Sequence, residues 1–154
     1  MVYRLPLRQP SVVVDADRPA YRNVTWDELV ETYGRQARAL VEGGVDAILI
    51  ETAQDLLQAK SAVIGAKRAM KTLDVYVPII VSVTIETTGT MLLGSEIGAA
   101  LTALSALGID SIGLNCATGP TEMSEHLRYL SKYSNLPVTV MPNAGLPILG
   151  PHGA

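Results

Sequence analysis

Four continuous apolar runs, each the length of one β-strand, alternate with longer stretches of helical periodicity along the chain. We expect strands over residues 45–50, 78–85, 111–115 and 137–141. The runs are apolar throughout rather than alternating with polar residues, which indicates a parallel sheet covered on both faces. The predicted fold class is therefore α/β.

Amphipathic helices are expected over residues 25–41, 55–70, 96–107 and 121–133. Thr25 and Glu28 have the spacing of a capping box, and Gly43-Gly44 ends the helix that they begin. Regular βα units of about 30–35 residues fit either an eight-fold barrel or an open doubly wound sheet. No GxGxxG motif follows a strand, so dinucleotide binding has no support.

The composition excludes several function classes. The net charge of −3 is too small to indicate a nucleic-acid partner, and no apolar run is long enough to predict a membrane span. The first ten residues lack the apolar core of a secretory signal. The single cysteine excludes an internal disulfide, so we expect a reducing, cytoplasmic location.

Polar residues stand at the carboxyl end of every expected strand. They are the pair Glu51 and Thr52, then Ser82, Thr84 and Glu86, then Asn115 with Cys116, and finally Asn143. The carboxyl ends of parallel strands meet at one rim, where α/β folds bind ligands. Any one of these residues has an equally good explanation as a cap for the next helix. Their joint position predicts a binding site.

Glu51 is the one carboxylate set directly on an apolar run, and we expect it to bind a substrate ammonium group rather than a structural partner. Cys116 has two interpretations. A lone cysteine is usually an inert buried side chain, but its place just past a strand also suits a nucleophile or a metal ligand. Neither histidine has ligand spacing to Cys116, so any further metal ligands must come from outside the chain.

Four segments resemble the homocysteine S-methyltransferase family, in the branch of the cobalamin-dependent methionine synthases. They are the run from Asp15 to Asn23, the run from Gly44 to Thr52 followed by Gln54-Asp55 and Ala59-Lys60, the run Gly113-Leu114-Asn115-Cys116-Ala117 with Gly119-Pro120, and the run Pro142-Asn143-Ala144-Gly145-Leu146-Pro147. The resemblance covers about residues 11–147. It implies an incomplete TIM (β/α)8 barrel over residues 25–147 that carries strands 4–7 of the family barrel. Residues 1–24 would be irregular, with a short strand at 12–14, and residues 148–154 would be a truncated loop.

The resemblance also implies a chemistry. Three cysteine thiolates hold a zinc ion that binds the homocysteine sulfur, and this sulfur accepts a methyl group to form methionine. Cys116 matches the first thiolate, and the other two lie outside the chain. Glu51 and Asn115 would bind the amino-acid end of homocysteine, with Ser82 and Asn143 as further candidates. Cobalamin, the methyl donor, would bind on another module. The apolar run 91–94 departs from the family's polar loop.

A half barrel needs a partner, because its inner face and two sheet edges lack cover. The expected partners are the remaining half of the barrel or other methionine synthase modules; alone, the chain should self-associate and be inactive. One alternative is a non-catalytic truncated barrel, or a half-barrel subunit completed by another chain. Another is a homocysteine methyltransferase that uses betaine or S-methylmethionine. A third keeps the barrel for other chemistry, such as pterin binding, with no role for Cys116.

Overall fold

The computed structural model describes residues 15–144, so the strand expected at 12–14 and the loop at 148–154 lie outside the described residues. Helices and strands alternate along this part of the chain. They are α1 (Trp26–Glu42), β1 (Ile48–Ala53), α2 (Leu56–Leu73), β2 (Ile79–Val83), α3 (Ile97–Ser105), β3 (Ser111–Asn115), α4 (Pro120–Tyr133) and β4 (Val138–Met141).

Local sequence signals set the helix ends. The capping box is confirmed: Thr25 accepts the Glu28 backbone N–H, and the Glu28 carboxylate accepts the Thr25 N–H. Gly43 is the C-cap of α1, as expected. Asp55 caps α2, and Pro120 opens α4 at a position where its missing N–H costs nothing. None of the helices described between residues 15 and 144 is long and apolar enough to cross a membrane.

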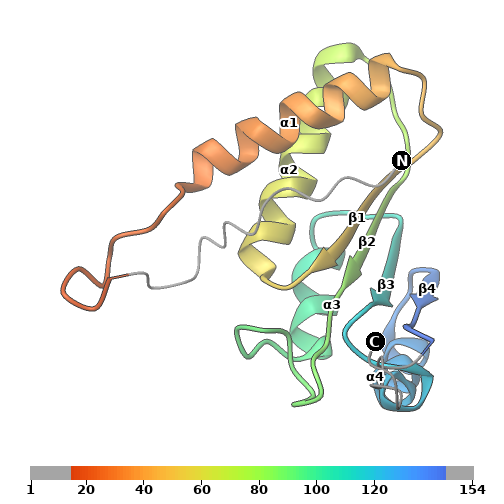
Figure 1. Cartoon of the computed structure of the whole chain (residues 1–154). Helices are drawn as coiled ribbons and strands as arrows, with labels where there is room; N and C mark the ends of the chain where they lie inside the picture. The colour runs from red at the N-terminus through yellow and green to blue at the C-terminus, as the bar shows by residue number, and fades with distance from the viewer. Residues whose placement is uncertain (1–14, 145–154) are drawn as a thin grey trace, which may run out of the picture.

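The strands form one parallel sheet in the order β1-β2-β3-β4 (Figure 1). Each strand therefore pairs with the next one along the chain, and right-handed crossovers place α2, α3 and α4 on the same face. A doubly wound sheet would reverse its strand order at a switch point. The order seen here has no reversal and is that of a barrel segment, which confirms the incomplete barrel.

The expected position of β1 was wrong by three residues. The strand begins at Ile48 rather than residue 45, and it continues through Glu51 and Thr52 to Ala53. The pairing with β2 becomes irregular after Ile50, so the polar pair lies within the strand instead of after it. Apolar run length could not reveal this because the irregular register depends on hydrogen bonds to neighbouring strands.

The face of the sheet toward the helices is apolar. Ile48, Val81 and Ile112 are buried there with the small residues of α2. The helix α1 lies across α2 (Figure 1), and the backbones approach closely where Gly34 meets Gly65. The opposite face, which would point into a closed barrel, carries the polar side chains of the candidate site.

Candidate functional site

The Asn115 side chain joins the carboxyl ends of β1 and β3. Its Oδ1 accepts the Thr52 N–H at 2.9 Å, and its Nδ2 donates to Thr52 Oγ1 at 2.8 Å. The same Nδ2 also donates to the Sγ of Cys116 at 3.2 Å. Asn115 is only 3% exposed, and its side chain thus holds the two strand ends together from a buried position.

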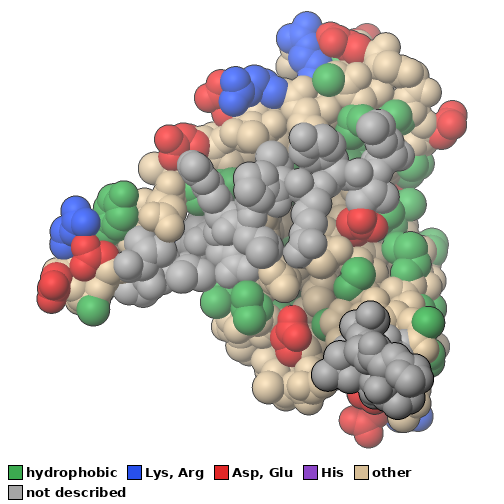
Figure 2. Space-filling view, in the orientation of Figure 1, with side chains coloured by type: hydrophobic (Ala, Val, Ile, Leu, Met, Phe, Trp, Pro, Cys, Tyr) green, Lys and Arg blue, Asp and Glu red, His purple; other side chains and the backbone are tan. Residues whose placement is uncertain are grey.

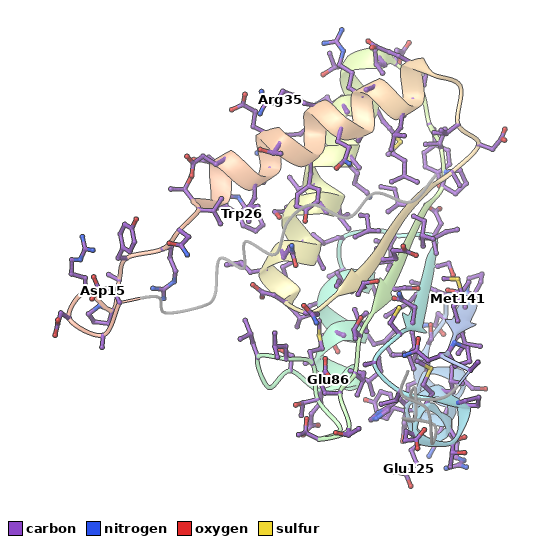
Figure 3. The ribbon with its side chains drawn as sticks, in the orientation of Figure 1. Asp15, Trp26, Arg35, Glu86, Glu125 and Met141 are labelled. Carbon is purple, nitrogen blue, oxygen red and sulfur yellow. The ribbon has the colours of Figure 1, made fainter. Side chains whose placement is uncertain are left out.

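Cys116 is partly exposed, at the start of the loop after β3. Its N–H bonds to the carbonyl of Met141 at 3.2 Å, and its carbonyl accepts the Thr118 N–H at 2.7 Å. The Thr118 carbonyl in turn accepts the N–H of Asn143 at 3.2 Å. The loops after β3 and β4 are therefore tied together, which brings Asn143 to the Cys116 loop. Figure 3 labels Met141 at the end of β4.

Backbone strain is concentrated at this rim. In the described part of the chain, four residues other than glycine have positive φ: Thr52, Asp74, Cys116 and Ala117. Asp74 is an ordinary left-handed helix cap of α2. The other three lie at the ends of β1 and β3, with φ of 56°, 57° and 57°. Such conformations cost about 1–3 kcal/mol each and cluster at functional sites.

The inward face of the sheet holds buried hydroxyl groups. Ser82, Gly113 and Thr139 pair in one row across β2, β3 and β4. Ser82 Oγ and Thr139 Oγ1, with Thr84 Oγ1, are buried and have no hydrogen-bond partner among the described residues. Buried hydroxyls rarely stay unpaired, so this surface is suited to a polar ligand or water.

Glu51 follows Ile50 near the carboxyl end of β1, where the pairing with β2 becomes irregular, and Ile50 pairs with Val81, the residue before Ser82. Glu51 is half-buried, and no ion pair within residues 15–144 neutralises it. The alternative role for Glu51, a structural salt bridge or helix cap, is not found among the described residues, and Asp55 caps α2.

Two tyrosines on other parts of the fold have raised pKa values. Burial raises the pKa of Tyr33, a hydrogen bond with Gln58 lowers it, and the Asp55 carboxylate raises it further. The hydrogen bond with Asp110 raises the pKa of Tyr76. Both phenols therefore stay protonated at neutral pH and do not act as bases.

Sequence reasoning missed two residues of this region. Thr139 was given no role because β-branched threonine is common in strands. What distinguishes it is its pairing with Gly113 on the neighbouring strand, which only the sheet register reveals. Thr52 was noted as a polar strand end, but its left-handed backbone and its bonds to Asn115 depend on β3. His126 is half-buried on α4.

The thiol of Cys116 suits one position of a zinc site. It is a soft ligand, partly exposed at the rim, and Asn115 donates a hydrogen bond to its sulfur. No group of three or more His, Cys, Asp or Glu side chains within residues 15–144 could hold a metal by itself. The described residues therefore fit a zinc ion as one contributor to a ligand set.

Comparison with known proteins gives a consistent result. The family model for homocysteine S-methyltransferase matches residues 9–153. The chain is 63% identical over 124 residues to the methionine synthase of Mycobacterium leprae, and 58% identical over 136 residues to that of Mycobacterium tuberculosis. These matches cover 80% and 88% of the chain but only 10% and 11% of those proteins. The chain thus spans about a tenth of the length of these curated relatives.

A solved structure has the same fold. The crystal structure of the Escherichia coli homocysteine methyltransferase MmuM, in its apo form, superposes with a TM-score of 0.67 at 17% identity. The match covers 80% of the chain and 45% of that protein. At this identity the likeness concerns the fold alone, and it agrees with a segment of a larger barrel.

Proposed function

The chain belongs to the homocysteine S-methyltransferase family, and we propose that it contributes one zinc-binding thiolate and part of the amino-acid pocket to a domain that methylates homocysteine. The observation that carries the proposal is the position of Cys116. Cys116 is partly exposed at the carboxyl rim, and its sulfur accepts a hydrogen bond from Asn115 and lies 3.9 Å from Thr52 Oγ1. A free cysteine kept for packing alone would be buried.

The inward face supports the substrate part of the proposal. Glu51, partly exposed near the end of β1, would offer a carboxylate to the ammonium group of an amino acid, and the Ser82 hydroxyl on β2 has no hydrogen-bond partner within residues 15–144. Asn143 is held beside the Cys116 loop through Thr118. Homocysteine carries a thiol and an α-amino acid group, so it could reach the rim sulfur and the carboxylate together.

The chemistry divides between the metal and the chain. Zinc, when bound, would keep the homocysteine sulfur as a thiolate at neutral pH, ready to accept a methyl group. Cys116 would supply one of its ligands, and Glu51 would orient the substrate by its ammonium group.

Calorimetry on the full-length protein that contains this chain tests the proposal. Homocysteine added to the zinc-loaded protein at pH 7 should release about one proton, because a free thiol with a pKa near 8.5 is mostly protonated at that pH. The released protons are counted by repeating the titration in buffers of different ionisation enthalpy. Equal homocysteine affinity and equal proton release after zinc removal would contradict the proposal.

Glu51→Gln is the matched control for this experiment. The substitution removes the carboxylate but keeps a similar shape, so homocysteine should bind about tenfold more weakly, the equivalent of about 1.4 kcal/mol. Proton release per bound homocysteine should not change, because the thiol chemistry depends on Cys116 and zinc.

We also propose that other parts of the protein complete the barrel. In the described sheet, β1 and β4 are the edge strands. Val138, Val140 and Met141 on β4 are exposed, and Figure 2 shows hydrophobic side chains at the surface on the side of β3 and β4. An uncovered apolar edge strand favours association.

The isolated chain is therefore expected to self-associate, as measured by sedimentation velocity. Val140→Lys places a charge on the β4 edge and should shift the chain toward monomer. Val75→Lys, at an equally exposed valine of another region, should leave association unchanged. If the unsubstituted chain sediments as a folded monomer, the β4 edge does not drive self-association.

Two finer points rest on the resemblance. We propose cobalamin as the methyl donor, bound on another module, and the cytoplasm as the location, where a free thiol stays reduced. The alternative of a non-catalytic half barrel predicts no zinc-dependent homocysteine binding, so the calorimetric experiment separates the two functions.

A further inference from the structure

We propose that Asn115 is a positioning residue that fixes the sulfur of Cys116 for metal binding, with Thr52 as its anchor on β1. The inference rests on the proposed function, since it assigns a role toward the same metal site. It gives Asn115 a different role from direct contact with the amino-acid end of the substrate.

The hydrogen bonds of Asn115 carry the first step of the argument. Both N–H bonds of the Nδ2 group are used, one on Thr52 Oγ1 at 2.8 Å and one on Cys116 Sγ at 3.2 Å. Its Oδ1 accepts the Thr52 N–H at 2.9 Å. A side-chain amide has two N–H donors and one oxygen. Both donors are used here, so neither N–H is left to bind a substrate carboxylate.

The strained backbone carries the second step. A β-branched residue at φ 56°, as at Thr52, needs its surroundings to hold it there. Asn115 bonds both the N–H and the hydroxyl of that residue, so it fixes the conformation from β3. Cys116, at φ 57°, is the next residue after Asn115. The Asn115 amide thus links Thr52 and Cys116, two residues with strained backbone whose Oγ1 and Sγ atoms lie 3.9 Å apart.

The third step concerns the sulfur itself. A thiolate ligand is oriented by hydrogen bonds from neighbouring groups, and such outer partners raise metal affinity about 10–100-fold. The Asn115 N–H donates to Cys116 Sγ at 3.2 Å from a side chain that is itself buried. The two hydrogen bonds to Thr52 keep this N–H donor in place when the sulfur binds no metal.

Zinc affinity of the full-length protein tests the inference, measured by competition with a chromophoric chelator. Asn115→Leu has similar size but no donor, and it should weaken zinc binding about 10–100-fold. Thr52→Val removes one acceptor of the amide but keeps the anchoring bond from the residue 52 N–H to Oδ1 and the bond to sulfur. It should therefore change zinc affinity less than about threefold, or about 0.6 kcal/mol. Unchanged zinc affinity in Asn115→Leu would overturn the inference.

Hydrogen exchange at the Thr52 backbone amide, resolved to the single residue, measures the hydrogen bond between Thr52 and Asn115 in the metal-free protein. The amide should be protected in the unchanged protein and should exchange in Asn115→Leu. If that amide exchanges while zinc affinity stays as before, Asn115 is only a cross-link and the inference is overturned. If Asn115→Leu fails to fold, the double variant with Thr52→Val leaves no orphaned hydroxyl and carries the same zinc prediction.

Cys116→Ala separates the two proposals. If this variant keeps the original zinc affinity, Cys116 is no ligand and the proposed function fails, taking the inference with it. If it loses zinc while Asn115→Leu does not, the proposed function stands and only the positioning role is refuted.

Discussion

Full-length protein carrying Cys116→Ala is expected to lose methyl transfer to homocysteine by more than about a thousandfold, beyond the roughly 10–100-fold cost of losing an outer partner of a metal ligand. The reason is that one thiolate of the proposed zinc site disappears. The measurement is methionine formed per minute at saturating homocysteine and methyl donor. Retained activity within about tenfold would show that the sulfur is dispensable.

The fold should survive this substitution. Alanine keeps the Cβ atom, so the strained backbone at φ 57° is neither worsened nor relieved. Cys116→Gly should be equally inactive but about 0.4–1 kcal/mol more stable, since glycine accepts this conformation freely.

Ala117→Gly is the matched control for the loss of activity. Ala117 also has φ 57°, and the substitution leaves the thiol in place. This variant should gain similar stability and remain active. Loss of activity in Ala117→Gly would point to the loop conformation rather than the sulfur.

Gly113→Ala is expected to lower the free energy of unfolding by about 3 kcal/mol or more, at the upper end of the cost of overpacking. A Cβ at this position would lie 2.1 Å from Thr139 Oγ1, 2.5 Å from the Thr139 carbonyl oxygen and 2.8 Å from Ser82 Oγ. The carbonyl belongs to the backbone of β4, so relief requires moving a strand. Urea unfolding of the same protein before and after substitution gives the difference.

Gly98→Ala is the matched control. A Cβ there would meet the hydroxyl of Tyr129 at 2.8 Å, but this side chain is exposed and can swing aside. The helix α3 gains up to about 1 kcal/mol from alanine, so the net change should be small. If Gly113→Ala proves as mild as Gly98→Ala, β3 and β4 do not approach as closely as described.

The sequence by itself determined the fold class and the rim on which the polar residues stand. Continuous apolar runs predicted buried parallel strands, and the capping box at Thr25 and Glu28 fixed the start of α1. These features are local, because hydrophobic periodicity and capping depend on residues a few positions apart. The resemblance carried by the residues around Cys116 extended this prediction to the family.

The tertiary structure alone decided which rim residues meet. The bonds from Asn115 to Thr52 join residues 63 positions apart, and no local pattern encodes such a pairing. The irregular register of β1, which puts Glu51 inside the strand, and the row of Ser82, Gly113 and Thr139 depend equally on neighbouring strands. The physical reason is that register and left-handed backbone are set by long-range hydrogen bonds, whereas helix caps and apolar runs are set by the chain's own neighbours.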